Sequence, residues 1–412
     1  MKYKQDEFKL DNSSIVYPAA KTKKWSAMFK MSATLKEDIE LDILKEALKV
    51  TLNRLPCFKT TLKKGPFWHY IKQIEGLPVI EKDVTHPMET LNIKANNGFL
   101  FRVRYDKNKL SFEYFHALTD GFGGLTFMLT TIKEYLSIKY NKEFSCGKYL
   151  LDCNETFKSK EYADDYYTYS KKGKAKYNDA VCFYPKSEPL PDHQISIHSI
   201  VVDTSTLKNV AKNFNITVGG LLTSIMAYSY YKAQKLTNTN KPIKVAVPVN
   251  LRYIYPSITM ANFTTFVTPE IKDTYKEYGF SDIVDMIRSY LKNQVNEENI
   301  NKQFSKMVKL ERNFFIKLIP LFIKIPIMRA IYLRQNKYFS TTFSNLGNVV
   351  LPDDISEYIE DINFMFGQAS IPKCIGGCVS YKDKTYINLS RTIKDDIIEK
   401  IFIETLKMLN IK

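Results

Sequence analysis

A polar interval near the middle of the chain restricts the fold more than any other feature of the sequence. Residues 152–193 show no hydrophobic periodicity, are rich in tyrosine and lysine, and end in a cluster of prolines. On both sides of this interval, short strand patterns alternate with amphipathic helix patterns. Such an interval is typical of a connection between two compact units. We therefore predict an N-terminal lobe (1–151), a crossover (152–193) and a C-terminal lobe (194–412).

The N-terminal half alternates strand and helix patterns, as expected for an α+β layer. A strand pattern at 25–35 precedes a helix over 41–55, in which apolar residues recur every three or four positions until Pro56. Two hairpins and a further helix follow. The hairpins join 57–62 to 67–74 and 100–105 to 110–116, and the helix carries Leu125, Met128, Leu129, Ile132 and Leu136 on one stripe.

The second half shows the same mixture of patterns. Helices are expected after Thr204 and after Thr217, with these threonines as N-caps, and over 283–295 and 394–409. Strands are expected at 195–202, 243–249, 263–268, 340–345, 363–368, 378–381 and 385–390. The predicted fold class is therefore α/β, with two α+β two-layer lobes.

The most apolar segment of the chain is 314–333. It also contains Lys317, Lys324 and Arg329 and two prolines, which makes it a poor membrane-spanning helix. We interpret the segment as a core or tunnel-lining element, with a helix lying on a membrane surface as the alternative. No transmembrane segment is predicted.

The chain is basic, with 60 Lys and Arg against 44 Asp and Glu and a formal net charge of +16. This excess favours an anionic partner, such as a membrane surface, an acidic carrier protein or a phosphorylated small molecule. Lysines spread over the surface for solubility are the simpler explanation. A nucleic-acid partner would rest on charge alone, because the aromatic residues are spaced as core residues and are not interleaved with basic ones.

The six cysteines give a weak metal signal. Only Cys374 and Cys378 are close in sequence, and no second cysteine or histidine cluster accompanies them. They lie in an apolar stretch, so we predict buried free thiols and no metal site. The sequence shows no signal-peptide pattern, and we expect a cytoplasmic protein.

The residues with the clearest chemical content are His116, Asp120 and Gly121. The histidine stands at the end of a predicted strand, and a tight turn and then a predicted helix follow it in the chain. An imidazole at a strand end can project from a rigid edge, and its pKa near neutrality lets it accept and return a proton. An aspartate four residues later can brace the turn, and glycine permits backbone conformations that other residues avoid.

The segment 116–121 (His-Ala-Leu-Thr-Asp-Gly) resembles the His-x-x-x-Asp-Gly signature of the chloramphenicol acetyltransferase and condensation-domain superfamily. Two further segments resemble the family in the same order. These are 248–252 (Pro-Val-Asn-Leu-Arg) followed by Asn262-Phe263, and 344–347 (Ser-Asn-Leu-Gly). The whole chain is similar to standalone members, particularly alcohol acetyltransferase-like and wax-ester-synthase-like enzymes. Phe115 stands where peptide-synthetase condensation domains usually have a second histidine, which favours a standalone enzyme.

The resemblance implies two similar lobes that enclose a tunnel, in which an acyl donor and an acceptor meet at the histidine. It assigns the general base to His116 and a structural role to Asp120 and Gly121, with Asp120 paired to Arg252. Hydroxyl or amide donors from the opposite lobe would stabilise an oxyanion. Ser344 and Asn345 are the candidates, and Ser340, Thr341 and Thr342 are close rivals.

The function expected from this resemblance is transfer of an acyl group from a thioester to a small hydroxyl or amine acceptor. The expected donor is acyl-coenzyme A, acting as co-substrate of a protein without a bound cofactor. An acyl carrier protein as donor is the chief alternative, and a non-catalytic binding module of the same fold is another. We expect a monomer.

Overall fold

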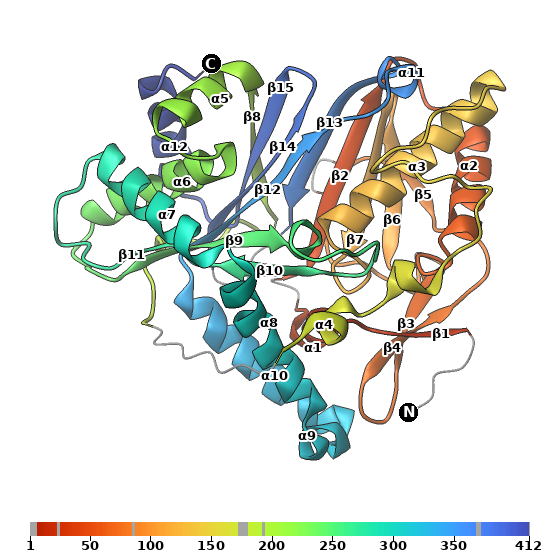
Figure 1. The fold of residues 1–412 in the computed structure, drawn as a ribbon, viewed down its shortest axis with the longest axis horizontal. Helices are drawn as coiled ribbons and strands as arrows, with labels where there is room; N and C mark the ends of the chain where they lie inside the picture. The colour runs from red at the N-terminus through yellow and green to blue at the C-terminus, as the bar shows by residue number, and fades with distance from the viewer. Residues whose placement is uncertain are drawn as a thin grey trace.

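The computed structural model describes residues 6–22, 25–84, 87–171, 180–191, 194–367 and 372–411. These residues form two α/β lobes that stand side by side in Figure 1, so the predicted two-lobed fold is confirmed. Residues 172–179, 192 and 193 of the predicted crossover, and Gln368 at the end of a predicted strand, lie outside the described residues.

The N-terminal lobe is built on a five-stranded sheet with helices on one face. The strand order is β13 (Ile359–Phe366), β2 (Met28–Leu35), β7 (Lys109–Phe115), β6 (Phe101–Asp106) and β5 (Ile80–Lys82). Helices α2 (Leu41–Arg54) and α3 (Gly121–Tyr140) pack on each other, and α3 packs on β2. A small sheet of β1 (Glu7–Lys9), β4 (His69–Gln73) and β3 (Thr60–Lys64) adjoins this lobe.

The C-terminal lobe contains a larger, mixed sheet. Its order is β10 (Thr264–Val267), β9 (Ile243–Asn250), β12 (Thr341–Val349), β14 (Cys374–Tyr381), β15 (Lys384–Arg391) and β8 (Ser196–Asp203), and β11 (Glu270–Ile271) also pairs with β9. Helix α6 (Val218–Lys235) lies on β9 and β12, and three other helices pack around it: α5 (Thr204–Asn213), α7 (Phe280–Gln294) and α12 (Ile397–Met408). The cap of α5 is the side chain of Asp203 and not Thr204, whereas Thr217 caps α6 as predicted.

One strand is exchanged between the lobes. Strand β13 belongs to the half of the chain assigned to the C-terminal lobe, and short helix α11 (Asp353–Ser356) leads into it. It pairs antiparallel with β2, so it completes the N-terminal sheet, and it also lies against β14 and β15. Asn388 on β15 fixes it further by donating to the carbonyl oxygen of Phe364 over 2.8 Å. The predicted lobe boundaries do not include this exchange.

The apolar segment 314–333 is not a core element. It forms α9 (Phe314–Leu318) and most of α10 (Leu321–Gln335), which follow α8 (Glu297–Arg312). Most of its large apolar side chains are exposed, so the predicted core or tunnel-lining role is wrong. Among the residues that the structure describes, no helix is long and apolar enough to cross a membrane.

Two short helices complete the framework near the junction of the lobes. Helix α1 (Val16–Ala20) contacts α10, and α4 (Asp165–Tyr169) contacts α8. In Figure 1 both lie below the two main sheets, beside the end of β10 and the small β1–β4–β3 sheet. The N-terminal segment therefore reaches the region where the two lobes meet.

Candidate active site

His116 directly follows β7, a central strand of the N-terminal sheet, at the strand end that faces the other lobe. Its backbone N–H donates to the carbonyl oxygen of Ala27 over 2.8 Å, which continues the pairing of β7 with β2. The ring of Tyr17 stacks on the imidazole at a centroid distance of 4.6 Å. Phe29 meets the imidazole edge-on at 5.1 Å. The half-buried histidine is thus held by two aromatic rings and a strand end.

Asn262, which comes from the opposite lobe, fixes the orientation of the imidazole. Its side-chain nitrogen lies within hydrogen-bond distance of three oxygen atoms, on Asp11 (3.1 Å), Ser14 (2.7 Å) and the backbone of His116 (3.1 Å). This surrounding identifies the nitrogen as the donor. The side-chain oxygen of Asn262 therefore faces Nδ1 of His116, 2.9 Å away, and accepts a hydrogen bond from it.

This contact determines the protonation pattern of His116. Because Asn262 presents an acceptor to Nδ1, the neutral imidazole carries its hydrogen there and has its lone pair on Nε2. Burial lowers the pKa of His116, against opposing contributions from its own backbone, Asp120 and Asn262. The ring is therefore neutral at pH 7 and can accept a proton at Nε2.

Asp11 anchors this arrangement from the N-terminal segment. Its carboxylate accepts from the backbone N–H groups of Ser14 (2.8 Å) and Asn262 (3.1 Å), from Ser14 Oγ and from the Asn262 amide. Burial raises its pKa to about 6, although these hydrogen bonds favour the charged form. No sequence pattern points to a functional role for Asp11, Ser14 or Tyr17, and only the turn-forming Asp-Asn-Ser-Ser run at 11–14 indicates local structure there.

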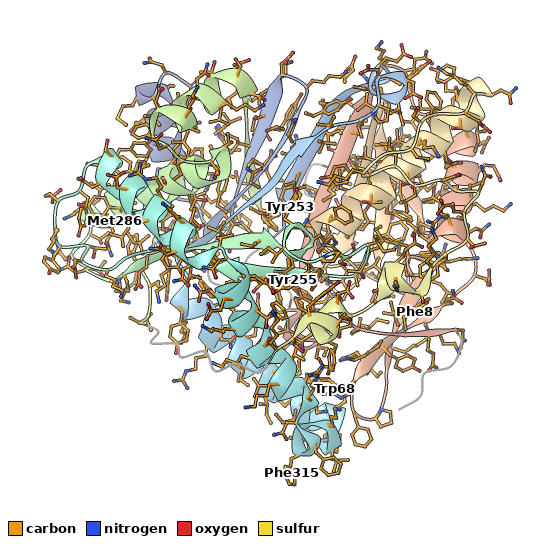
Figure 2. The ribbon with its side chains drawn as sticks, viewed as in Figure 1. Phe8, Trp68, Tyr253, Tyr255, Met286 and Phe315 are labelled. Atoms are coloured by element: carbon orange, nitrogen blue, oxygen red, sulfur yellow. The ribbon has the colours of Figure 1, made fainter. Side chains whose placement is uncertain are left out.

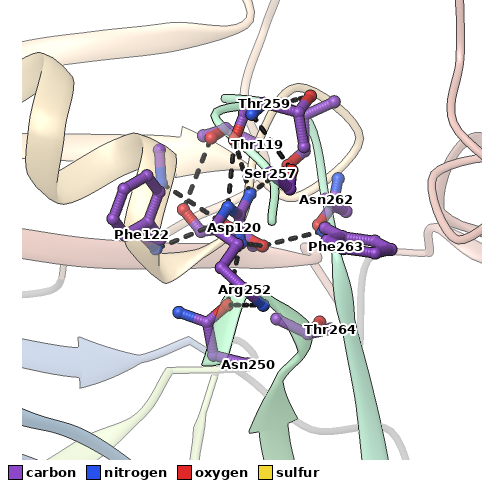
Figure 3. Close-up of polar contacts among 12 residues, drawn as sticks. Thr119, Asp120, Phe122, Asn250, Arg252, Ser257, Thr259, Asn262, Phe263 and Thr264 are labelled. Atoms are coloured by element: carbon purple, nitrogen blue, oxygen red, sulfur yellow. Dashed lines mark hydrogen bonds and ion pairs between the residues drawn. The ribbon is translucent and has the colours of Figure 1, made fainter. Parts of the chain in front are cut away.

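Asp120 connects the turn after His116 to the opposite lobe. One carboxylate oxygen accepts from the backbone N–H groups of Phe122 and Gly123, each over 3.1 Å, and so caps α3. The other accepts from Arg252 over 2.8 Å and from the backbone N–H of Phe263 over 2.9 Å. Figure 3 shows the carboxylate at the centre of these contacts.

The predicted contact between Asp120 and Arg252 is present, but it is not bidentate. A single guanidinium nitrogen reaches one carboxylate oxygen. The other donors of Arg252 bind the carbonyl oxygens of Thr259 (3.1 and 2.7 Å) and Ala261 (2.7 Å) and the side-chain oxygen of Asn250 (3.2 Å). The guanidinium group also lies 4.6 Å from the ring centre of Phe122. Both side chains are almost fully buried, at 5% exposed for Arg252 and 1% for Asp120. Arg252 thus holds the 259–261 loop as well as Asp120 (Figure 3).

The glycines after Asp120 are required by close packing and not by an unusual backbone angle. A Cβ at Gly121 would lie 2.6 Å from a methyl group of Leu346, and one at Gly123 would lie 2.3 Å from the carbonyl oxygen of Met260. Both contacts join α3 to the C-terminal lobe. Gly121 is not among the described glycines with positive φ, so the conformational role expected for it is wrong.

The two oxyanion candidates lie on opposite faces of β12. Segment 344–347 is part of the strand with a register irregularity after Asn345, and is not a simple turn. Phe343 belongs to the core of the C-terminal lobe, and the Asn345 side chain lies against Gly219 at the start of α6. Strand alternation places Ser344 on the other face, towards the N-terminal lobe.

The rivals at the start of β12 and just before it are partly occupied by structural contacts. Ser340 Oγ accepts from the backbone N–H of Lys244 over 3.3 Å, and Thr341 Oγ1 donates to the carbonyl oxygen of Cys374 over 2.7 Å. Thr342 shares the face of Ser344 by alternation. Ser344 and Thr342 therefore suit a role at the junction of the lobes better than the other three residues.

Cys374 and Cys378 lie on β14, and both side chains are buried in the apolar core of the C-terminal lobe. Burial raises the pKa of each thiol. Within the described ranges, no group of three or more His, Cys, Asp or Glu side chains could hold a metal ion.

Comparisons with known proteins identify the fold. No family model matches the chain, and no curated protein matches it. Among solved structures, polyketide synthase associated protein 5 from Mycobacterium tuberculosis superposes with a TM-score of 0.61 at 14% identity, over 97% of this chain and 96% of that one. The TRI3 trichothecene 15-O-acetyltransferase from Fusarium sporotrichioides gives a TM-score of 0.62 at 13% identity, over 97% and 93%.

A starter condensation domain of rhizomide synthetase, in complex with C8-CoA, gives a TM-score of 0.64 at 11% identity, over 98% of this chain and 94% of that one. These matches extend over nearly the full length of both partners. The chain therefore has the two-lobed fold of condensation domains and trichothecene acetyltransferases, which confirms the predicted resemblance at the level of fold.

Proposed function

We propose that the protein is an acyltransferase in which His116 acts as general base on a hydroxyl or amine acceptor. The observation that carries this proposal is the hydrogen bond from Nδ1 of His116 to Asn262, because it leaves a lone pair on Nε2 of a neutral imidazole. The fold shared with an acetyltransferase and a condensation domain supports the same reaction class.

The proposed reaction follows from this protonation state. Nε2 of His116 takes the proton from the acceptor as its oxygen or nitrogen attacks the thioester carbonyl carbon. The resulting oxyanion is stabilised by a hydroxyl donor, for which Ser344 is the candidate and Thr342 the rival. The carbon–sulfur bond then breaks, and the departing thiolate takes the proton back from Nε2 of His116, which gives the free thiol and restores the neutral imidazole. Asp120 and Arg252 fix the turn that carries the base and do not exchange protons with substrate.

Acyl-coenzyme A is the proposed donor. The net charge of +16 would favour its phosphates, and the similar rhizomide synthetase domain was solved with C8-CoA. An acidic acyl carrier protein would satisfy the same charge and is the second candidate. Incubating the protein with acetyl-coenzyme A and longer acyl thioesters, against a panel of alcohols and amines, tests the reaction class through release of free thiol. Absence of thiol release with every donor and acceptor, carrier-bound thioesters included, would favour a non-catalytic binding module.

The donor assignment predicts a salt effect. If surface charge attracts an anionic thioester, KM for acyl-coenzyme A should rise with ionic strength while kcat changes little, since salt screens exposed charges at distances beyond about 10 Å at 0.1 M. A short neutral thioester without the nucleotide is the control, and its KM should stay constant. Equal responses of the two donors would mean that the charge serves solubility alone.

The role of Asn262 predicts a change in the pH profile. Asn262→Ala removes the acceptor from Nδ1, and loss of one such hydrogen bond should lower kcat/KM by about tenfold. This bond also raises the pKa of His116, so its loss should move the acid limb of the kcat/KM profile to lower pH. The limb should already lie below the ordinary histidine value, since burial lowers the pKa, and activity should fall as pH decreases through it.

Asn388→Ala is the matched control for this variant. Asn388 is also a buried asparagine that binds across the lobes, but its side chain contacts Asn363, Phe364 and Ser199 and not His116. It should lower stability without moving the pH profile. Identical profiles for wild type and Asn262→Ala would contradict the positioning role.

A further inference from the structure

The surface around α9 and α10 is unusually apolar for a part of the molecule that faces solvent. Phe314, Phe315 and Phe322 are 66%, 78% and 74% exposed. Figure 2 shows Phe315 projecting from the end of α9, away from both lobes, with Trp68 beside the same helices. We call this surface the apolar tip. Its further exposed members are Met307, Leu310, Leu318, Ile323, Ile327, Ile331 and Leu333.

Helix α10 carries apolar side chains around most of its circumference, interrupted by Lys324, Arg329 and Arg334, and only one side of it is covered. The covered side packs on α1, and Tyr332 on it stacks on Trp25 at a centroid distance of 4.3 Å. Ile323, Ile327 and Ile331 follow one another at intervals of four residues and form an exposed stripe. A contiguous exposed apolar surface of this kind normally marks a site that protein or lipid covers, so we expect a partner on the exposed side of α10.

The tip is held rigidly in this exposed position. The backbone N–H of Leu321 donates to the carbonyl oxygen of Pro66 over 2.8 Å, and Lys324 Nζ donates to that of Phe67 over 3.1 Å. The same ammonium group lies 3.5 Å from the ring centre of Trp68. Arg329 donates to the carbonyl oxygen of Lys21 over 2.8 Å. The β3–β4 turn and the end of α1 therefore brace α10, and Lys324 Nζ ties α9 to it by donating to the carbonyl oxygen of Lys317 over 3.3 Å.

The charges around the tip have one sign. Residues 302–337 contain nine lysines and arginines and a single acidic residue, Glu311. Glu311 is buried and paired with Lys9, so it does not present a negative charge at the surface. Lys309 and Lys317 are exposed beside the apolar side chains. This combination complements an anionic surface that also offers hydrocarbon.

We propose that the apolar tip docks the protein on the surface of an anionic phospholipid bilayer, with the phenylalanines in the interfacial region and the basic side chains at the headgroups. The helices lie on the membrane, because none described is long and apolar enough to cross it. A second copy of the chain is a poorer occupant, since a self-complementary interface would bring the two sets of positive charges together. The inference does not depend on the acyl-transfer reaction.

Sedimentation with vesicles tests the docking. Phosphatidylcholine vesicles containing phosphatidylserine should bind the 412-residue chain, pure phosphatidylcholine vesicles should bind it less, and binding should weaken with salt. The variant Phe315→Ser with Phe322→Ser removes two large apolar anchors and should reduce partitioning at least about tenfold. Lys309→Glu with Lys317→Glu should reduce it by a similar factor on the anionic vesicles.

Matched controls separate the tip from general surface effects. Leu236→Ser removes a side chain that is 73% exposed at the end of α6, and Lys94→Glu with Lys208→Glu reverses two exposed charges elsewhere. The apolar control should bind like wild type, and the charge control should lose less than the Lys309 and Lys317 pair. Circular dichroism and thermal unfolding should be unchanged in all variants. Absence of vesicle binding, equal binding by tip and control variants, or self-association abolished by the phenylalanine changes would overturn the proposal.

Discussion

Replacing His116 by alanine is expected to lower kcat by about 10²–10⁴-fold, the usual cost of losing a general base. The imidazole packs between Tyr17 and Phe29 and makes one side-chain hydrogen bond, so its removal should leave the two lobes assembled. Thiol release in the presence of acceptor, measured beside a thermal unfolding curve, gives both quantities. His116→Gln should be equally inactive, because an amide can form the bond to Asn262 but cannot carry a proton between acceptor and thiolate.

A buried histidine outside the site provides the control for this experiment. His69 lies on β4, and burial lowers its pKa to about 4, so it is also neutral at pH 7. His69→Ala should cost some stability and leave kcat near the wild-type value. Wild-type turnover by a folded His116→Ala variant would refute the proposed base.

Asp120→Asn and Arg252→Ala are each expected to destabilise the protein by about 3–5 kcal/mol, because each change leaves the other charge buried without its partner. Activity should fall as well, since the turn that carries His116 loses its support. The double variant should be less damaged than the sum, with a coupling energy of about 0.5–3 kcal/mol. Full recovery is not expected, because Asp120 also caps α3 and Arg252 also binds the 259–261 loop. Denaturant unfolding of the four proteins measures the cycle.

The pair Arg54–Glu161 is a suitable comparison. It is bidentate, with distances of 2.8 and 2.6 Å, and similarly buried, but it joins α2 to the 159–162 segment. Arg54→Ala should lower stability to a comparable extent while the folded fraction keeps its kcat. Strictly additive effects of the Asp120 and Arg252 changes, or equal losses of kcat in the two pairs, would contradict the positioning role.

Much of the secondary structure could be predicted because local sequence patterns determine it. The helix at 41–55, the hairpin that ends at His116 and the C-terminal helix all follow from apolar spacing and turn residues, and the structure confirms them within a few residues. The core or tunnel-lining role predicted for the segment 314–333 was wrong for a physical reason. An apolar run looks the same in sequence whether neighbours cover it or leave it exposed, and its burial depends on α1 and the β3–β4 turn.

Some residues of the candidate site could likewise be predicted from the sequence, and others could not. His116, Asp120 and Arg252 were accessible through a motif and its order along the chain, and the structure brings Asp120 and Arg252 together from 132 positions apart. Asp11 and Tyr17 were not accessible, because their importance arises only when the N-terminal segment folds against Asn262 and His116. Likewise, the face of β12 that carries Ser344 can be told from that of Asn345 only once Phe343 is seen in the core.

The exchanged strand β13 has a consequence for how the chain folds during synthesis. Strand β2 pairs with β7 on one side. Its partner on the other side is formed by residues 359–366, which leave the ribosome long after Leu35. Until then the N-terminal sheet exposes an unpaired, apolar edge that can join the edge of another chain. Pairing over such sequence separation is slow, because a long loop must close before the contact forms. Productive folding therefore depends on keeping nascent chains apart, and a fragment ending before residue 359 should aggregate.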